Sequence, residues 1–480
     1  MQNVIQEALS YDDVLLKPKY SPILSRSDVS TKTKITKNIE LNIPIVSSNM
    51  DTVTEHKMAI AMARLGGVGI IHRFLSPRQQ AIEVQKVKRA ESLIIDNPYT
   101  VGVTNTLEDI KLLRRQHNVS SFLVVNKNNV LLGIVTRRDT LFENGDNPSV
   151  RQMMTPKDKL ITGSKDISLE EAEKLLHKNR IEKLPLVNSK GELVGLITTS
   201  DIEKRNDFPL AVKDKKGRLI VGAAIGVKDG VLERAKALVA AGADFLVIDI
   251  AHGHSIAAIE TIKLIKKNFP DIDIIGGNVA TADGATEIIK AGADGIKVGV
   301  GPGSICVTRI VAGSGVPQFT AVQECAVIAK KHNIPVIADG GIKTSGDVTK
   351  AIAAGADMVM LGNLLSGTEE TPGKVLYKDG KQYKIYRGMA SFGAVSGRAE
   401  TEKGEWQEDA TDGVVPEGVE SLMEYKGPVK NIIDQLVGGF RSGMTYSGAK
   451  TIEEFHKNAE FVKITSGGMR ESSHHDVVKL

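Results

Sequence analysis

Short apolar runs that end in Gly, Asn or Asp recur along the chain and alternate with amphipathic stretches. This alternation predicts β–α units around a parallel sheet, because strands covered on both faces are apolar throughout and crossover helices carry one apolar face. Eight units predict a closed α/β barrel of the (β/α)8, or TIM, type rather than an open sheet. The eight runs are Ile43–Ser48, Val68–His72, Leu219–Ile225, Phe245–Asp249, Ile272–Gly277, Gly295–Val300, Ile334–Asp339 and Met358–Gly362.

Several of the amphipathic stretches end in a small-residue turn centred on glycine. The glycines are Gly242, Gly292 and Gly355, with Gly66 in a similar setting. Glycine adopts the left-handed conformation that commonly ends a helix, so these positions predict helix C-caps that lead into the next strand. The predicted helices include Val231–Ala241, Ala282–Ala291, Ala321–Lys331 and Thr349–Ala354.

The regular spacing breaks between the second and third strands, where roughly 110 residues exceed what a barrel connection needs. We therefore predict an inserted domain over residues 94–205, with the barrel formed by residues 1–93 and 206–480. The insertion contains a repeat, since Asn97–Asp139 and Ile161–Asp201 share one pattern of strand, helix, strand, turn and strand. The predicted helices are Leu107–His117 and Leu169–Lys178, and the predicted hairpin turns are Asn126–Asn129 and Asn188–Gly191.

Composition excludes some classes of protein but does not identify a ligand. The chain has 62 basic and 58 acidic residues, a net charge of +4 that gives no sign of a nucleic-acid partner. Two cysteines in 480 residues cannot form a disulfide framework and indicate free thiols in a reducing compartment. No apolar run approaches membrane-spanning length, and the first residues lack a signal-peptide pattern. We expect a cytoplasmic protein without a membrane partner.

The strongest chemical signal is the segment Gly299–Arg309, which contains Cys306 and follows the sixth predicted strand. Its glycines permit a tight loop at the C-terminal mouth of the barrel, where catalytic loops gather. A thiolate there is a strong nucleophile. The alternative is a buried structural cysteine, which suits Cys325 in its helical run but not Cys306 in a glycine loop.

A second constellation suits a phosphate ester. Asp339-Gly340-Gly341 ends the seventh predicted strand and Leu361-Gly362-Asn363 ends the eighth, and barrel enzymes commonly hold phosphate on backbone N–H groups after these two strands. Ser304 and Tyr386 could add hydroxyl groups. A carboxylate repels phosphate, so Asp339 suits a ribose diol instead. The alternative is that these glycines form ordinary turns and bind no phosphate.

Five motifs together resemble the IMP dehydrogenase/GMP reductase family over nearly the whole chain. They are the Cys306 loop, Asp339–Ile342, Leu361–Asn363, Tyr386–Met389 and Asp51–Val53. The resemblance implies an oxidoreductase in which Cys306 adds to purine C2 of GMP or IMP, assisted by Thr308 and Glu417. It implies nucleotide binding by Ser304, Asp339, Gly341, Gly362, Asn363, Tyr386, Gly388 and Met389, with the phosphate on Ser304, Gly341, Gly362, Asn363 and Tyr386.

The resemblance also implies a dinucleotide, a cation and an oligomer. Asp249, Asn278 and Gly299 correspond to the dinucleotide side of the site. A monovalent cation such as K⁺ is implied on the carbonyls of Gly301, Gly303 and Cys306, with Glu471 of the partner subunit as a further ligand. The family forms homotetramers, which contacts between inserted domains could pair into octamers.

The inserted repeat resembles a tandem CBS module. In relatives, the Thr and Asp of its Gly-apolar-apolar-Thr-x-x-Asp endings contact the ribose of adenine or guanine nucleotides. The resemblance thus implies that ATP or GTP binds at Thr136 and Asp139 and at Thr198 and Asp201. The alternative is that the module only shields the barrel or mediates assembly, because the fold alone fixes no ligand.

The branch of the family depends on the segment between Tyr386–Met389 and Val415–Gly418. Dehydrogenases pass hydride to NAD⁺ and then hydrolyse the adduct, using a flap Arg-Tyr pair as base. No Arg-Tyr pair occurs in Ala390–Gln407, and Glu405-Trp406 stands about where it would be. A reductase releases ammonia and takes hydride from NADPH, so it needs no such base, while Thr308 and Glu417 can handle the amine.

We therefore predict a GMP reductase that uses NADPH. The alternative is an IMP dehydrogenase that uses NAD⁺ and an unconventional base such as Glu405 or His252. Segments such as Asp249–Ser255 and Gly468–Asp476, together with the CBS pair, are dehydrogenase-like, whereas Asn49 and Met444–Ala449 are reductase-like. An alternative of another class is a catalytically silent nucleotide sensor built on the same barrel.

Overall fold

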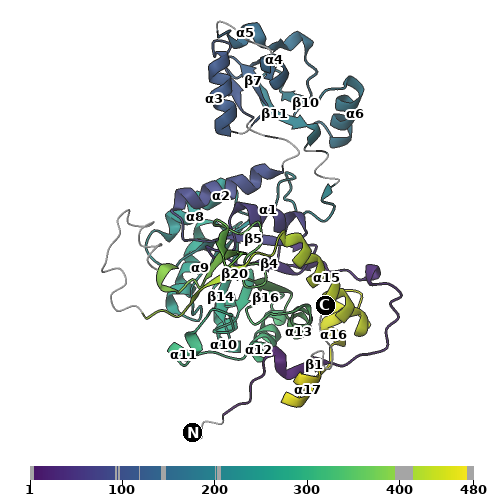
Figure 1. Ribbon diagram of the computed structural model, residues 1–480, viewed down its shortest axis with the longest axis vertical. Coiled ribbons are helices and arrows are strands. Elements are labelled where there is room, and N and C mark those ends of the chain that lie inside the picture. Colours follow the sequence, from purple (N-terminus) through teal and green to yellow (C-terminus); the bar gives the residue numbers. More distant parts are fainter. Residues whose placement is uncertain are drawn as a thin grey trace. The chain divides into compact units, whose positions relative to one another are not determined.

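The computed structural model describes residues 5–91, 95, 98–117, 119–141, 147–200, 202, 207–394 and 415–472. The chain divides into two compact units (Figure 1). One comprises Met1–Ala90, Leu210–Asp214 and Leu219–Leu480, and the other comprises Glu91–Pro209 and Lys215–Arg218. Among the helices of the described residues, none is long and apolar enough to cross a membrane.

The larger unit is built on a closed barrel of eight parallel strands, which confirms the predicted fold class. All eight predicted runs contribute a strand, although most strands are a few residues shorter than the run. The exception is β14, which extends two residues beyond it. The barrel strands are β4 (Ile45–Ser47), β5 (Val68–Ile71), β12 (Gly222–Ile225), β13 (Phe245–Ile248), β14 (Asp273–Val279), β15 (Gly295–Val298), β16 (Val336–Asp339) and β17 (Met358–Leu361).

Helices surround these strands, and a glycine in the left-handed conformation follows four of the helices, as the sequence predicted. Gly66, Gly242, Gly292 and Gly355 all have φ between +96° and +113°. Helix α12 begins three residues before its predicted start, and α13 begins four residues before, where Thr344 accepts a capping bond from the Asp347 N–H. The surrounding helices are α1 (His56–Arg64), α2 (Pro77–Ala90), α8 (Val231–Ala241), α9 (Ile256–Asn268), α10 (Ala282–Lys290), α12 (Gln318–Lys331), α13 (Ser345–Ala353) and α15 (Val429–Tyr446).

The barrel interior is apolar and closely packed. Phe245 is fully buried, and the facing Gly222 has no room for a side chain, since a Cβ there would lie 2.4 Å from the Phe245 ring. Large and small residues therefore alternate across neighbouring strands, as close packing requires. Ile35, in the loop between β2 (Thr33–Lys34) and β3 (Glu40–Leu41), belongs to the same buried cluster.

Further elements lie outside the barrel. An antiparallel sheet of three strands is formed by β18 (Leu376–Lys378), β19 (Lys381–Arg387) and β20 (Glu420–Glu424). A two-stranded sheet joins the two ends of the unit, because β1 (Val14–Leu16) pairs with β21 (Phe461–Lys463). The remaining short elements are η1 (Tyr11–Asp13), η2 (Arg26–Asp28), α11 (Thr308–Val311), α16 (Ile452–Asn458) and α17 (Ser466–Glu471).

The smaller unit contains the predicted repeat. Each half has a hairpin, and the turns place Asn129 (φ 58°) and Gly191 (φ 76°) at equivalent left-handed positions, a conformation that Asn and Gly tolerate. The halves share a core of Leu123, Leu131, Ile134, Leu193 and Leu196. The elements are β6 (Thr100–Val101), α3 (Leu107–His117), β7 (Ser121–Val125), β8 (Leu131–Thr136), α4 (Arg137–Leu141), α5 (Val150–Met153), β9 (Thr155–Pro156), η3 (Lys157–Lys159), α6 (Leu169–Asn179), β10 (Lys183–Val187) and β11 (Leu193–Thr198).

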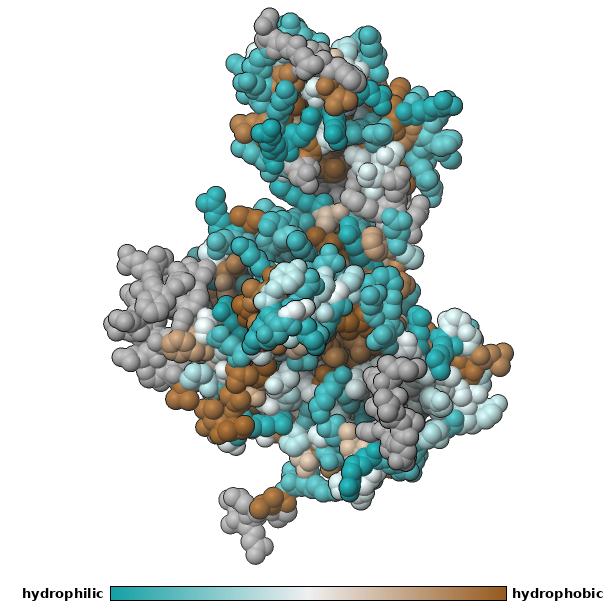
Figure 2. Space-filling model, in the orientation of Figure 1, coloured by the Kyte–Doolittle hydropathy of each residue, from teal (hydrophilic) through white to brown (hydrophobic). Residues whose placement is uncertain are grey.

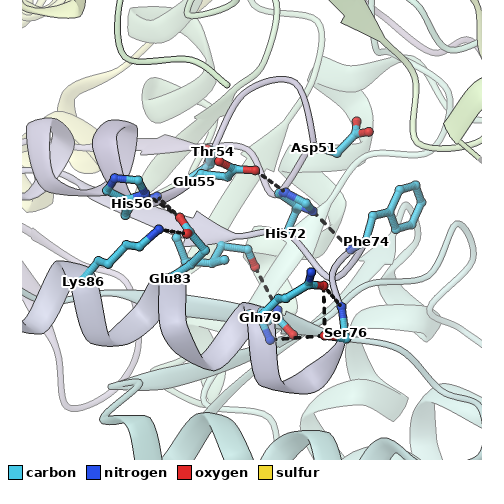
Figure 3. A network of polar contacts seen from close by, with 12 residues as sticks. Asp51, Thr54, Glu55, His56, His72, Phe74, Ser76, Gln79, Glu83 and Lys86 are labelled. Carbon is cyan, nitrogen blue, oxygen red and sulfur yellow. Dashed lines mark hydrogen bonds and ion pairs between the residues drawn. The ribbon is translucent and has the colours of Figure 1, made fainter. Parts of the chain in front are cut away.

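A polar network fixes α1 against α2 on the outside of the barrel (Figure 3). Glu83 of α2 accepts bonds on both oxygens, from His56 Nδ1 at 2.6 Å and from Lys86 Nζ at 2.6 Å. Glu55 lies in the same group, and its Oε1 is 3.5 Å from His72 Nε2. Glu55, His56 and Glu83 are ligand types for a metal, but His56 and Lys86 already satisfy the Glu83 carboxylate. The group is therefore best described as an ion-pair network between helices.

This network predicts an acid-sensitive contribution to stability. Burial acts to raise the pKa of Glu83, but hydrogen bonds from His56 and Lys86 outweigh it and lower the pKa from 4.5 to about 2. The contribution is therefore complete above pH 4.5 and is lost as the pH falls through about 2. We expect Glu83→Gln to lose on the order of 2–3 kcal/mol of unfolding free energy at pH 7, with the difference from the parent shrinking below pH 4.5.

Urea unfolding of both proteins from pH 7 to pH 3 measures this difference. Glu287→Gln is the control, because Glu287 forms an exposed pair with Lys290 on α10, and such pairs contribute roughly 0–1 kcal/mol. Equal unfolding midpoints for the Glu83→Gln protein and the parent at pH 7 would contradict the interpretation.

Candidate active site

A cavity of about 300 Å³ opens at the carboxyl ends of the barrel strands. Its walls come from the loops after β4, β13, β15, β16 and β17 and from the segments next to β19 and β20. The lining residues include all of the predicted catalytic and nucleotide-binding residues: Ser304, Cys306, Thr308, Asp339, Gly341, Gly362, Asn363, Tyr386, Gly388, Met389 and Glu417. The structure therefore brings together residues spread over more than a hundred positions.

Cys306 lies in a loop whose backbone the glycines shape. Gly299 has φ +149°, and a Cβ there would lie 2.1 Å from the carbonyl oxygen of Asp339, so only glycine fits beside the seventh strand. Beyond it, the loop bonds to the segment before β20, with Val307 N donating to Glu417 O at 2.9 Å and Val419 N to Ile305 O at 3.0 Å. These bonds hold Glu417 close to the Cys306 thiol. Cys306 is half-buried and Cys325 is fully buried, as the two sequence contexts predicted.

Three side chains form a hydrogen-bonded line at the cavity wall. Cys306 Sγ lies 3.2 Å from Thr308 Oγ1, and the Thr308 hydroxyl donates to Glu417 Oε2 at 2.6 Å. A proton acceptor is thus joined through one hydroxyl to a nucleophile. Such a line can move a proton to or from a group bound at the sulfur.

The opposite part of the cavity has the features of a phosphate cradle. Gly340 and Gly341 have φ of +92° and +81°, and a Cβ on Gly362 would lie 3.1 Å from the Tyr386 hydroxyl. Burial raises the pKa of Tyr386 to about 12, the nearby charge of Asp339 adds to the rise, and a hydrogen bond with Ser304 opposes it. The Tyr386 hydroxyl therefore stays protonated at neutral pH and can donate to an anion.

Asp339 is held by two partners that bond the same oxygen. Lys297 Nζ and Asn278 Nδ2 each lie 2.9 Å from Asp339 Oδ2. Lys297 is only 3% exposed, and it also contacts the Asn278 amide oxygen. The buried lysine compensates the charge of the half-buried Asp339 carboxylate and holds its orientation. A carboxylate held in this way suits the hydroxyl groups of a sugar, as the sequence suggested.

The three residues predicted for the dinucleotide side are grouped beside the cavity but do not line it. Asp249 bonds Arg73 Nε at 2.7 Å, and Asn278 donates to the carbonyl oxygen of Gly299 at 2.8 Å. Burial acts to raise the pKa of Asp249, but the charges of Arg73 and Lys297 and hydrogen bonds from Arg73 and Asn49 lower it overall. Asp249 is thus an anion at neutral pH.

The residues predicted to hold a cation are in one loop, except for Glu471. Gly303 and Cys306 line the cavity, and Gly301 has φ +84° and packs against Arg309. Backbone carbonyls are suitable ligands for K⁺, but Gly303 O also accepts the Cys306 N–H at 3.1 Å. Glu471 is the last residue of the exposed helix α17, which contacts η1. Within the described chain, Glu471 therefore lies in a different element from the loop that contains the three carbonyls.

In the smaller unit, the predicted nucleotide residues are only partly described. Asp139 Oδ2 accepts bonds from Thr136 N at 2.7 Å and from Thr136 Oγ1 at 2.8 Å. Thr198 is half-buried at the end of β11, and Asp201 lies outside the described residues. Glu405 and Trp406, which stand about where the dehydrogenase Arg-Tyr pair would be, also lie outside them.

Sequence reasoning missed several residues at the cavity. Ser48 and Met50 line it, and Ser48 Oγ is buried without a hydrogen-bond partner among the described residues. Their position just after the first barrel strand could have identified them, because barrel sites form at carboxyl ends. Lys297 was also detectable, since a lysine within an otherwise apolar strand needs a partner.

The surface next to the Cys306 loop is apolar. Ile310 and Val311 of α11 are 85% and 43% exposed, and Figure 2 shows brown surface over this part of the larger unit. Exposed apolar residues in a group are uncommon away from binding surfaces.

Comparison with known proteins places this site in a family. Residues 8–475 match the IMP dehydrogenase / GMP reductase domain. The chain is 55% identical over 476 residues to inosine-5'-monophosphate dehydrogenase of Nitrosopumilus maritimus, with 99% of each chain covered. It is 51% identical over 485 residues to GMP reductase of Leishmania donovani, covering 99% of this chain and 98% of the relative.

A solved structure is similarly close. The crystal structure of a GMP reductase variant from Trypanosoma brucei, in complex with guanosine 5'-monophosphate, has a TM-score of 0.93 and 49% identity, with 99% of each chain covered. Oxidoreductases of this family use a nicotinamide dinucleotide. The closed barrel, the cysteine loop at its mouth and these similarities together show that the chain belongs to the IMP dehydrogenase/GMP reductase family.

Proposed function

We propose that the protein is a GMP reductase, which converts GMP, NADPH and two protons to IMP, NADP⁺ and ammonium. The observation that carries the proposal is the hydrogen-bonded line from Cys306 through Thr308 to Glu417. In this line the Glu417 carboxylate can exchange a proton with an amine that leaves the carbon attacked by the Cys306 sulfur. The sequence supports it, since no Arg-Tyr pair follows Met389 to activate water. The Leishmania and Trypanosoma relatives carry the same activity in their names.

In the proposed reaction, Cys306 Sγ forms a bond to purine C2 and the C2–N bond to the amino group breaks. Thr308 and Glu417 relay the proton that lets the amine leave as ammonia. NADPH supplies the hydride to C2, after which the C–S bond breaks and the thiolate returns. Asp339 holds the ribose, and Ser304, Gly341, Gly362, Asn363 and Tyr386 hold the phosphate, so the purine ring is fixed above the thiol.

A second candidate function is the IMP dehydrogenase reaction, in which IMP, NAD⁺ and water give XMP and NADH. The 55% identity to the Nitrosopumilus enzyme favours it. Both reactions use the same covalent step at Cys306, so the described site serves either one. They differ in whether water must be activated.

Steady-state assays with the purified protein distinguish the two reactions. We expect NADPH oxidation that depends on GMP, at rates of the order of 1 s⁻¹ or faster, and little NADH formation from IMP and NAD⁺. Parallel assays with NADH in place of NADPH establish the preferred donor. NADH formation from IMP without GMP-dependent loss of NADPH would reject the reductase proposal in favour of the dehydrogenase.

Substitutions along the line from Cys306 test the chemical step. We expect Cys306→Ala to abolish turnover and Glu417→Gln to lower kcat by roughly 10²–10⁴, because the amide cannot accept the relayed proton. Cys325→Ala is the matched control, since Cys325 is buried in α12 away from the cavity. The measurements are kcat and the binding of GMP by calorimetry. A Cys306→Ala protein that still turns over, or a Glu417→Gln protein with parental kcat, would contradict the assignment.

We further propose that the smaller unit is a tandem CBS module that binds ATP or GTP. Its charge distribution supports an anionic ligand. Arg114 of α3 bonds Thr140 at 3.0 Å, but its Nε and Nη2 are buried without partners among the described residues. Burial lowers the pKa of Arg114, and the nearby Arg137 lowers it further. Two guanidinium groups close enough to interact electrostatically, one of them next to Thr136 in sequence, suit the phosphates of a nucleotide.

Nucleotide titrations test this regulatory site. We expect saturating ATP or GTP to change activity or assembly severalfold in the parent, and Asp139→Ala, alone or with Asp201→Ala, to weaken the response. Light scattering and initial rates provide the two readouts. Parental responses in both variants, or no response in the parent, would reject the site.

The cation and the oligomer belong to the same proposal. The carbonyls of Gly301, Gly303 and Cys306, with Glu471 of the partner subunit, would hold K⁺ and stiffen the Cys306 loop. A homotetramer would supply that glutamate and cover the apolar residues Ile310 and Val311.

A further inference from the structure

Two motif residues that the proposed chemistry leaves unused contact each other across 336 positions of sequence. Arg387 Nε donates to Asp51 Oδ2 at 2.8 Å, and Arg387 Nη2 contacts the same oxygen. The Arg387 backbone N–H also donates to Thr52 Oγ1 at 3.3 Å. The Asp51 side chain is only 8% exposed, and the Arg387 side chain is 28% exposed. This pair is therefore a partly buried, charge-assisted contact and not a loose surface pair.

Each partner adjoins a different wall of the cavity. Asp51 directly follows Met50, which lines the cavity from the loop after β4. Arg387 ends β19 and directly precedes Gly388 and Met389, which line the cavity from the other side. Figure 3 shows Asp51 apart from the Glu55–His72 and His56–Glu83 pairs, with no bond to the residues of that network.

The wall that contains Met389 also supports the reacting groups. Gly388 N donates to Val419 O at 3.0 Å, and Val419 N donates to Ile305 O at 3.0 Å. The end of β19 is thus bonded to the segment that carries Glu417, and that segment is bonded to the Cys306 loop. A shift of Arg387 relative to Asp51 would therefore move Met389 and Glu417 relative to the barrel.

We propose that Asp51 and Arg387 are positioning residues for the covalent step. Their ion pair sets the separation between the Met50 and Met389 walls, so that the purine ring is held with C2 at Cys306 and the Thr308–Glu417 line. This inference rests on the proposed function, but it applies to either reaction of the family because both begin with attack at C2. The glycines of the phosphate cradle follow β16 and β17 of the barrel and not β19, so among the cradle residues Tyr386 is the one next to the pair.

Kinetics of Asp51→Asn test the proposal. The amide keeps the size of the side chain and leaves Arg387 in contact with solvent, so the fold should survive. We expect kcat to fall about tenfold or more, as small misplacements at a reacting centre do, while KM for the nucleotide changes less than about threefold. Arg387→Lys keeps the charge and should recover part of the kcat that Arg387→Gln loses.

Two comparisons separate positioning from general stability. Glu424→Gln breaks the exposed Lys381–Glu424 pair on the same sheet and should leave kcat, KM and the unfolding midpoint unchanged. The double variant Asp51→Asn/Arg387→Gln should lose no more kcat than either single variant, because both remove one contact. Additive losses, a parental kcat in Asp51→Asn, or a lower kcat together with a higher KM and a lower unfolding midpoint would overturn the proposal.

The assays also separate a failure of the positioning proposal from a failure of the reductase proposal. If the parent oxidises IMP and does not reduce GMP, the reductase proposal fails. The same comparison of variants, made with IMP and NAD⁺, then tests the positioning role by the same changes in kcat and KM.

Discussion

Closure of the eight parallel strands is the constraint on which the site depends. Parallel strands all point the same way, so closing the sheet brings eight carboxyl ends to a single rim. Segments far apart in the sequence therefore lie side by side at this rim: the thiol loop after β15, the glycines after β16 and β17, and Ser48 after β4. Because the barrel wall is close-packed, as the fit of Phe245 against Gly222 shows, these loops start from fixed positions.

Much of this arrangement could be predicted because it depends on local rules. Apolar runs locate the strands, and a glycine with positive φ follows four of the barrel helices, so Gly242, Gly292 and Gly355 could be identified in advance. The rule that barrel sites lie at carboxyl ends then selected Cys306 and Asp339. The same rule, applied to the first strand, would also have selected Ser48.

What local rules could not predict is the pairing of side chains that are distant in sequence. Thr308 and Glu417 are 109 positions apart, and only the family resemblance paired them in advance, because no periodicity reveals that the segment before β20 pairs with the Cys306 loop. The sequence likewise suggested Asp249 and Asn278 as ligands, yet their contacts with Arg73 and Lys297 are made within the protein. Such contacts depend on the register of neighbouring strands and on which way each side chain turns.

Family membership does not decide the reaction, and the structure gives a physical reason. The residues that we propose to attack C2, hold the nucleotide and relay a proton all belong to the barrel rim and to the segments bonded to it, and in our proposal both reactions use them. The dehydrogenase reaction would require one further base to activate water, and Ala390–Gln407 contains no Arg-Tyr pair to supply it. This segment closely follows Arg387, whose contact with Asp51 we propose to position the cavity wall. We therefore expect the sequence of this segment, rather than the barrel, to distinguish a reductase from a dehydrogenase.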